Sequence, residues 1–557
     1  MIALFSGIPD NLTYNDWLLD NFFLHNTLVV TGVLFLFFLA MLFLNRRELW
    51  QEIKIEKKVA IILLFIFLLG FWLRNSKYSL GEHTDGWVYA ESAKFIIAQG
   101  IYVKDCAIGN LQSCRLYEQV LAPPGYPFLI SIAYMLFGIN TIYACIISGI
   151  LGSLTILLIF YITKKLFDEK TGLISALIFA LFPYDLLFAG SGHVRSTSLF
   201  FIALTIFFYL IAIEKDKIKN WVLLAATLSF AVYVRQENIV LLAPMVLGLF
   251  LFGYFTNAKH SKKPIEFKAK LFFVKFLLPA LVFVLTQLPV QRWVTSGYLG
   301  VPSIFSIQSF FITTPRIIAD FFITKNFYAK RIRGFSMLYN PLVSICFFAS
   351  IFFLLKGIKR KQQLFLSSIF IVYFLVVTSY SPNVKQSYDY IRQSHPLVMP
   401  VAIISAFVLD EVNKRIIKRD LFFLFAIAAI LALSSNLDFT PTLFNDARQS
   451  MPPTEALHFS ATNSTPNNCT IITPLYLVPV SDAIPENRRR TVNYWLIDFT
   501  KDLVNEEIAQ SNCVIFFDDT SYATLLAQNR QFFEELKKER LFAVESSESK
   551  IIAYKIK

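Results

Sequence analysis

The apolar stretch VAIILLFIFLLGFWLR, residues 59–74, is followed shortly by the polar stretch GEHTDGWVYA, residues 81–90. The apolar run is close to the minimum of about 17 residues that a membrane-spanning helix needs. The polar stretch places one carboxylate, that of Asp85, just beyond the end of this run. The junction therefore predicts a membrane scaffold that presents a polar site at the boundary between lipid and water.

The composition of the whole chain agrees with a membrane scaffold. Of the 557 residues, 55% are hydrophobic and 16% are charged, and the mean hydropathy is +0.55. A soluble domain of average composition carries about 25% charged residues. The net charge of +13 comes from short basic clusters between apolar runs, which is typical of cytoplasmic loops of membrane proteins. We therefore expect no binding to nucleic acid.

Twelve apolar runs are expected to span the membrane. They lie at roughly residues 28–44, 59–74, 140–161, 172–189, 198–213, 221–235, 238–255, 271–290, 341–356, 363–380, 396–411 and 421–433. The basic cluster in residues 45–58 recurs in every second loop afterwards, and such loops face the cytoplasm. Parity then places the loops 75–139 and 291–340 on the extracytoplasmic side, together with both ends of the chain.

Residues 125–139 form a further apolar run that parity excludes from the spans. Counting it as a span would place the basic cluster that begins at Lys164 outside. We expect a short helix that lies in the outer membrane interface. The alternative is a true span, with one of the twelve counted wrongly.

The composition changes after the last apolar run. Residues 1–436 are predicted to form the transmembrane domain, which is all helical, and residues 437–557 a small soluble α/β domain outside the membrane. Strand-like runs in this second domain lie at residues 469–477, 513–517, 541–544 and 550–554, with helical patterns such as residues 522–538 between them.

Four of the six cysteines lie on the predicted outer side, where thiols can oxidise. Cys106 and Cys114 share the first outer loop, and Cys469 and Cys513 each open a predicted strand, so either pair could form a disulfide. The other two, Cys145 and Cys346, lie in apolar spans and are expected to be buried as small hydrophobic residues.

Asp85 has two interpretations on local pattern. Thr84 or Asp85 is a good N-cap for a short helix that begins at this point. Alternatively, Asp85 is a carboxylate held at the membrane boundary for chemistry. Local sequence leaves both open.

The wider pattern resembles the membrane glycosyltransferases of the GT-C class, most closely the protein O-mannosyltransferase and lipid A aminoarabinose transferase branch. The resemblance covers about the first 430 residues and depends on the order and spacing of several motifs. These are Asp85 followed by WVYAESAK (87–94), APPGYP (122–127), the span that ends KKLFD (164–168), FPY (182–184), RSTSLF (195–200) and YVRQEN (233–238). The mannosyltransferases typically have Asp-Glu where this chain has Asp85-Gly86.

The resemblance implies an inverting transferase that takes a sugar from a polyprenyl-phosphate donor on the outer face of the membrane. Asp85 would be the general base that deprotonates an acceptor hydroxyl of a protein, lipid or glycan. One carboxylate suffices in this scheme, because a lipid phosphate leaves without protonation, unlike the leaving group of glycoside hydrolysis. The loop 291–340 would cover the site and exclude water.

A phosphate donor needs positive charge, and arginine offers a phosphate two parallel N–H donors. The outer-side candidates are Arg392, Arg235, Arg195 and His395. Arg392 is the first choice and Arg235 the second. Weaker candidates for the donor and acceptor groove are Glu91, Tyr126, Lys104 and Arg292. The alternative for each arginine is a side chain that snorkels at the end of a span, and Arg235 also has Glu237 as a local partner.

No required metal is expected. Oligosaccharyltransferase relatives bind a divalent ion with several acids, whereas the loop 291–340 offers only Asp320. Two other functions stay open: a transporter or flippase of a lipid-linked substrate, in which Asp85 is only a helix cap, and a non-catalytic membrane subunit, which Gly86 in place of an acid would suit.

Overall fold

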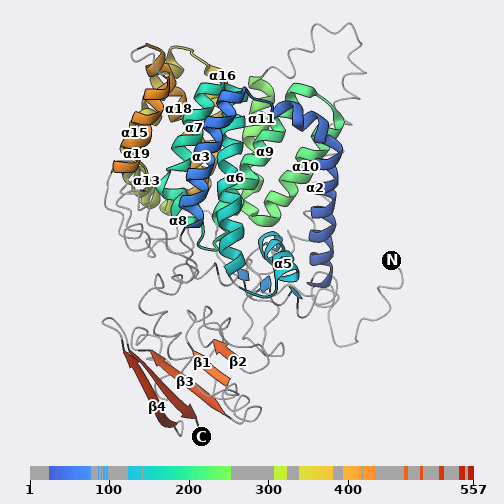
Figure 1. The fold of residues 1–557 in the computed structure, drawn as a ribbon, viewed down its shortest axis with the longest axis vertical. Helices are drawn as coiled ribbons and strands as arrows, with labels where there is room; N and C mark the ends of the chain where they lie inside the picture. The colour runs from blue at the N-terminus through green and yellow to red at the C-terminus, as the bar shows by residue number, and fades with distance from the viewer. Residues whose placement is uncertain are drawn as a thin grey trace.

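The computed structural model describes the greater part of the helical region and the strands of the C-terminal region. The described residues are 24–76, 86, 89–90, 92–93, 96–97, 123–140, 142–252, 307–322, 338–379, 393–415, 420–434, 470–473, 490–493, 513–519, 538–545 and 550–556. The helices form one body, and the sheet lies below it in Figure 1, toward the end where α5 lies.

The helices of this body run from α2 to α19. They are α2 (Leu24–Glu52), α3 (Lys57–Asn75), α5 (Gly125–Phe137), α6 (Ile142–Leu166), α7 (Glu169–Ala180), α8 (Pro183–Phe188), α9 (Val194–Lys215), α10 (Ile218–Val234), η4 (Gln236–Leu241), α11 (Leu242–Leu251), α13 (Ile307–Phe322), α15 (Pro341–Leu355), α16 (Arg360–Ser379), η6 (His395–Leu397), α18 (Val398–Arg415) and α19 (Asp420–Ser434).

Among the described residues, six helices are long and apolar enough to cross a membrane. They are Leu28–Glu52 within α2, then α3, α6, α9, α16, and η6 with α18 as one helix, His395–Arg415. The shorter apolar helices α10, η4 with α11, and α15 coincide with three further predicted spans. The run at 271–290 lies outside the described residues. The structure thus confirms a polytopic helical domain, while the number twelve stays a prediction.

The predicted single span over residues 172–189 is wrong. The chain forms α7 and the short helix α8 instead, and Pro183 occupies the first turn of α8. Proline disfavours helical conformation in the residue before it, and Phe182 is extended, with φ −76° and ψ 112°. At the end of α7, Arg74 donates hydrogen bonds to the carbonyl groups of Phe179 and Ala180, so these carbonyl groups keep partners where the helix stops.

Basic clusters from different loops meet at one end of the helical body. Lys165 at the end of α6 and Lys215 at the end of α9 both pair with Glu52 of α2. Lys217 and Lys219, beside the start of α10, both pair with a second acid of α2, Glu48, at 2.7 and 2.8 Å. Three of the connections that parity assigns to one side, those after α2, α6 and α9, therefore lie side by side in space.

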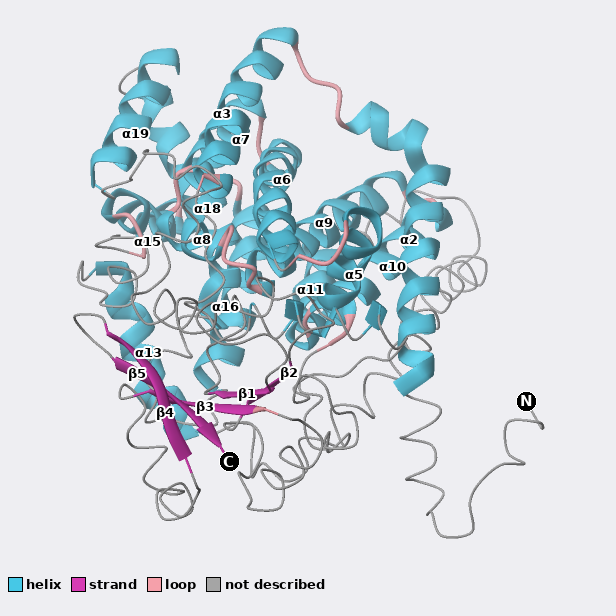
Figure 2. Cartoon of the chain, turned by 60° about the horizontal axis from the view of Figure 1, so that its bottom comes forward, coloured by secondary structure: helices cyan, strands magenta, loops and turns pink. Residues whose placement is uncertain are grey.

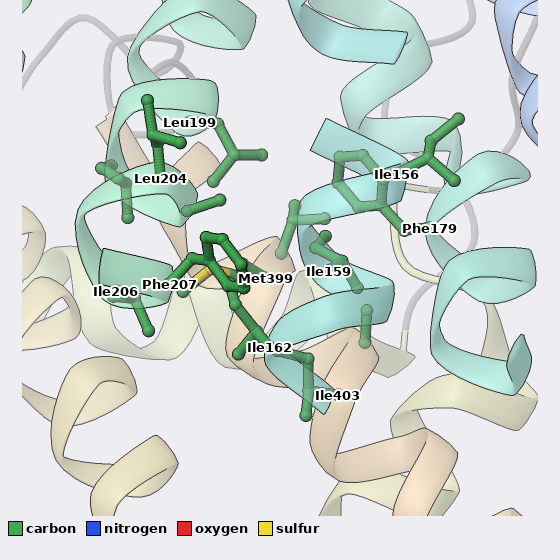
Figure 3. Packing of buried hydrophobic residues seen from close by; sticks show 14 of the residues in the cluster. Ile156, Ile159, Ile162, Phe179, Leu199, Leu204, Ile206, Phe207, Met399 and Ile403 are labelled. Carbon is green, nitrogen blue, oxygen red and sulfur yellow. The ribbon is translucent and has the colours of Figure 1, made fainter. Parts of the chain in front are cut away.

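The core of the body lies between α6, α7, α9 and α18. Figure 3 shows Ile159 and Ile162 of α6 near Phe207 of α9 and Met399 of α18, whereas Ile156 of α6 lies beside Phe179 of α7. All of these side chains are buried. Close packing of these four helices fixes the positions of the segments that connect them at the α8 end.

The helix predicted at residues 125–139 is confirmed as α5. Its 13 residues give a length of about 20 Å, which is less than the roughly 30 Å of a hydrocarbon core. It packs against α2, α6 and α10. Its last residues, Met135, Leu136 and Phe137, are exposed, as expected of a short helix whose end enters an apolar phase.

The C-terminal region contains a five-stranded sheet of order β2-β1-β3-β5-β4, drawn in magenta in Figure 2. The strands are β1 (Thr470–Thr473), β2 (Arg490–Asn493), β3 (Val514–Asp519), β4 (Lys538–Glu545) and β5 (Lys550–Ile556). β1 is parallel to β2 and β3, whereas β5 is antiparallel to β3 and β4. Each of the four predicted strand regions overlaps one of these strands.

Sequence analysis missed β2, which has only four residues and follows a run of arginines. The helical pattern at 522–537 lies outside the described residues, so the α/β character of this domain stays a prediction.

The cysteines follow the predicted division. Cys145 and Cys346 are buried and form no disulfide, while Cys513, directly before β3, is disulfide-bonded. Thr470 is the register partner of Val514 in the parallel pair β1–β3; the pairing of Cys469 with Cys513 stays a prediction. Cys469 itself lies outside the described residues, as do Cys106 and Cys114.

Candidate functional site

The predicted site residues divide into two groups. Those that the structure describes are Arg195, Arg235, His395 and Tyr126. The predicted base Asp85 lies outside the described residues, as do Arg392, Glu91, Lys104 and Arg292.

Arg195 and Arg235 come together around one amide oxygen. Arg195 lies in the first turn of α9, and Arg235 follows α10 in extended conformation, with φ −154° and ψ 125°. Nη1 of Arg195 and Nη2 of Arg235 donate to Oε1 of Gln393, at 3.2 and 3.1 Å. Two guanidinium groups from different helices therefore share a neutral acceptor.

Arg235 also pairs with Glu237. Among the described residues, the cluster thus brings two guanidinium groups and one carboxylate together. The Arg195 residue is buried, and the side chain of Arg235 is 11% exposed. A pair of guanidinium groups in a partly buried position suits an anion such as a phosphate.

A second polar cluster links His395 to a buried ion pair. Nε2 of His395 lies 3.0 Å from Oδ1 of Asp185 in α8. The other oxygen of Asp185 accepts from Nε and Nη2 of Arg74 in α3, at 2.9 and 2.8 Å. Asp185 and Arg74 are fully buried, and the side chain of His395 is 1% exposed.

Arg74 uses its remaining N–H groups on backbone oxygens. Nη1 donates to the carbonyls of Gly70 and Ala180, at 3.2 and 3.0 Å, and Nη2 donates to that of Phe179, at 2.8 Å. The charge thus lies at the C-terminal end of α7, where a helix dipole favours a cation. A buried charge is tolerated when its donors are satisfied in this way.

Tyr126 anchors α5 to the segment between α8 and α9. Its hydroxyl lies 2.8 Å from the carbonyl oxygen of Ala144 and 2.9 Å from that of Gly192. Its ring packs edge-on against Tyr89 at 5.3 Å, and the side chain is fully buried. The structure gives Tyr126 a packing role beside the predicted loop.

The fold gives a steric reason for glycine at position 86. The residue is buried, and a Cβ placed on it would lie 2.8 Å from the backbone oxygen of Ser191. An acidic side chain at this position, as in the mannosyltransferases, would need one of the two segments to move. Glycine here therefore reflects close packing against the segment before α9, and a degenerate site is not needed to explain it.

Sequence analysis missed Arg74, Asp185 and Gln393 as members of these clusters. A signal was present for the first two, because each is a charge inside or at the end of an apolar run, and such charges require partners. Gln393 carries no comparable signal. As to metals, the described residues contain no group of three or more His, Cys, Asp or Glu side chains arranged to hold an ion.

The loop predicted to cover the site contains a helix. α13 lies within 291–340 and packs against α15 and α16. Its Phe321 stacks on Tyr339 at 4.0 Å, and Tyr339 packs edge-on against Tyr184 of α8 at 5.3 Å. Part of this loop is therefore packed through aromatic rings to the helix that carries Asp185.

Comparison with known proteins adds a family model and a relative. Residues 122–283 match the model described as dolichyl-phosphate-mannose-protein mannosyltransferase. An uncharacterized protein of Aquifex aeolicus (strain VF5) is 26% identical over 400 residues, which cover 69% of this chain and 70% of that protein.

Solved structures show which fold the chain has. ArnT from Cupriavidus metallidurans bound to undecaprenyl phosphate aligns with a TM-score of 0.57 at 12% identity, over 90% of this chain and 98% of that one. The archaeal oligosaccharyltransferase AglB from Archaeoglobus fulgidus, in complex with an inhibitory peptide and a dolichol-phosphate, aligns with a TM-score of 0.52 at 14% identity, over 89% and 74%. The resemblance to the GT-C class of membrane glycosyltransferases is thereby confirmed.

Proposed function

From this shared fold, we propose that the chain is an integral membrane glycosyltransferase that moves a sugar from a polyprenyl-phosphate donor to an acceptor hydroxyl. Two similar structures hold a polyprenyl phosphate, undecaprenyl phosphate in ArnT and a dolichol-phosphate in AglB. The family model that matches residues 122–283 also describes a dolichyl-phosphate-sugar enzyme. The donor class is common to all three.

The observation that carries the proposal is the convergence of Arg195 and Arg235 on Gln393. Their guanidinium groups would bind the donor phosphate and stabilise the charge that grows on it as the sugar leaves. Arg392, next to Gln393 in the sequence, would add a third guanidinium group to this site.

Asp85 would act as the general base. The acceptor oxygen attacks the anomeric carbon while its proton passes to the carboxylate of Asp85, and the bond between that carbon and the phosphate oxygen breaks. Polyprenyl phosphate leaves with the electron pair, and the configuration at the anomeric carbon inverts. The packing of Gly86 against Ser191 supports this placement, because it brings the residue next to Asp85 to the segment that leads into α9 and Arg195.

The proposed reaction takes place on the extracytoplasmic side, and the C-terminal domain would help to position the acceptor. Two observations support this sidedness. The sheet lies at the α5 end of the helical body, whereas the C-terminal ends of α2 and α9 lie at the other end (Figure 1), and there Glu52 pairs with Lys215. Cys513 is disulfide-bonded, as is typical of an oxidising compartment.

The test separates donor binding from chemistry. Arg235→Gln is expected to weaken binding of undecaprenyl phosphate to the purified protein about 10- to 100-fold, since a hydrogen bond to a charged group contributes about 1.5–3 kcal/mol. Asp85→Asn is expected to leave this affinity unchanged and to slow sugar transfer about 10²- to 10⁴-fold, the usual contribution of a general base. The donor for the transfer assay is the lipid-linked sugar that co-purifies with the protein, identified by mass spectrometry.

Arg415→Gln is the matched control, because Arg415 is exposed and lies at the far end of α18. It should change neither quantity. Transfer at the wild-type rate by Asp85→Asn would show that Asp85 is only a helix cap. Donor binding without any transfer by the wild-type protein would favour a flippase.

A further inference from the structure

The turn that leads into α18 is held through each of its side chains. Gln393 accepts hydrogen bonds from the two arginines of the proposed phosphate site. The hydroxyl of Ser394 is hydrogen-bonded to that of Tyr184, and Nε2 of His395 lies 3.0 Å from Oδ1 of Asp185. One short helix, α8, therefore holds two of these three consecutive residues.

Asp185 determines which way His395 faces. Its carboxylate is ionised because it pairs with Arg74 within the body, and a carboxylate in this state only accepts hydrogen bonds. Nε2 of His395 must therefore carry the proton of the 3.0 Å hydrogen bond. The orientation of the imidazole follows from an ion pair that connects α8 to α3.

The surroundings of His395 do not suit a phosphate ligand. Its ring packs edge-on against the rings of Tyr184 and Phe188, at 5.8 and 5.2 Å. With Nε2–H used on Asp185, Nδ1 is the ring nitrogen left for another ligand, and this atom is buried without a hydrogen-bond partner among the described residues. A ring nitrogen enclosed in this way is closed to a phosphate.

We propose that His395 and Asp185 are positioning residues for the donor phosphate site. Together with Arg74 they fix the turn that carries Gln393, and Gln393 in turn sets the distance and orientation of Arg195 and Arg235. This role rests on the proposed function and differs from direct phosphate binding by His395. It also connects the phosphate site to the end of α3, from which the chain continues toward Asp85.

The first variant is His395→Phe, which keeps an aromatic ring between Tyr184 and Phe188 and removes the hydrogen bond to Asp185. Asp185 retains Arg74, so the fold should persist. We expect affinity for undecaprenyl phosphate to fall roughly ten- to hundredfold, as expected when binding groups are misplaced. Turnover at saturating donor should fall as well, because misplaced arginines stabilise less of the charge that grows on the leaving phosphate.

A rescue variant and a control separate positioning from general loss of stability. His395→Gln offers an amide N–H toward Asp185 and should restore most of the donor affinity. Ser405→Ala removes another buried hydrogen bond of α18, from the Ser405 hydroxyl to the Val343 carbonyl at 2.8 Å, and should lower the melting temperature without changing donor affinity. Equal effects of Ser405→Ala and His395→Phe on donor affinity would overturn the proposal.

Double-mutant cycles decide how His395 acts. If it acts through Gln393 on the arginines, the effects of His395→Phe and Arg235→Gln on donor affinity will be less than additive, because residues of one network couple. Additive effects would show an independent role, such as direct contact with phosphate, and would contradict positioning.

The same cycle on melting temperature without donor tests the network independently of the proposed function. Non-additive shifts are expected, and additive shifts would overturn the inference even in a protein that binds donor. If the wild-type protein does not bind undecaprenyl phosphate, the proposed function is overturned and the donor-positioning role with it. In that case non-additive shifts in melting temperature would still show that the turn is coupled to Arg235.

Discussion

At the scale of single residues, Gly86 shows how one missing side chain controls the approach of two segments. Its Cα faces the backbone oxygen of Ser191 closely enough that a Cβ would lie at 2.8 Å. Backbone on both sides leaves little room for adjustment. The departure from the Asp-Glu pattern of the mannosyltransferases is therefore a packing feature of this chain.

We predict that Gly86→Ala impairs both stability and transfer. Overpacking of a buried site costs about 1–3 kcal/mol, and relief of the contact would move the adjoining Asp85 away from Ser191. Thermal unfolding in detergent should show a lower melting temperature, and transfer should fall while affinity for undecaprenyl phosphate is retained. Wild-type transfer and stability in Gly86→Ala would show that the close approach is not required.

At the scale of elements, the turn between α6 and α7 is tied to α18 by Asp168. Its carboxylate accepts from the N–H and the hydroxyl of Thr171, at 2.8 and 2.9 Å, and lies 3.2 Å from Nζ of Lys414. Burial alone would raise the pKa of Asp168, but these hydrogen bonds and the charge of Lys414 outweigh it and lower the pKa below its usual value.

The lowered pKa predicts a pH-dependent contribution to stability. A carboxyl group whose folded pKa is depressed stabilises the fold above its unfolded pKa of about 4 and loses this contribution as the pH falls through the folded value. Asp168→Asn should therefore melt below the wild-type protein at pH 7, and the difference should shrink between about pH 4 and pH 2. A difference of the same size at pH 7 and pH 3 would contradict this assignment.

The break between α7 and α8 has a consequence for the site. The pair Arg74–Asp185 occupies the junction, where Arg74 satisfies carbonyl groups at the end of α7 and Asp185 reaches His395. A continuous helix through this region would use those carbonyl groups itself. This break lies inside the region predicted as one span, residues 172–189. It is the feature that allows α8 to hold the turn before α18.

At the scale of the whole molecule, the sheet lies toward one end of the helical body, and the C-terminal ends of α2, α6 and α9 lie toward the other (Figure 1). These helix ends carry Lys165 and Lys215, both paired with Glu52. If the lysine end faces the cytoplasm, as the positive-inside rule predicts, the sheet faces outward. This arrangement would place the C-terminal domain where an extracytoplasmic acceptor could meet it.

Labelling of introduced cysteines tests this topology. Asp216→Cys lies in the turn between α9 and α10, and Arg540→Cys lies at an exposed position of β4. A membrane-impermeant maleimide should label Arg540→Cys in intact cells and Asp216→Cys only after permeabilisation, each compared with the unsubstituted chain. The reverse pattern would invert the proposed orientation and move the site to the cytoplasmic side.

Much of the fold could be predicted because hydropathy, charge spacing and strand patterns are properties of neighbouring residues. They predicted the polytopic helical body, α5 as a short additional helix, four of the five described strands and the buried state of Cys145 and Cys346. They did not predict the break at Pro183, because the apolar run continues through it.

By itself the sequence determined that this protein is a helical membrane protein with basic loops on alternate connections, and the order of its motifs indicated the GT-C class. Only the tertiary structure decided which polar residues meet. Arg74 and Asp185 are 111 positions apart, and Arg195 and Gln393 are 198 apart. Such contacts depend on how helices pack, because buried charges and amides pair only when they are close in space. Periodicity along the chain carries no information on which distant residues come close.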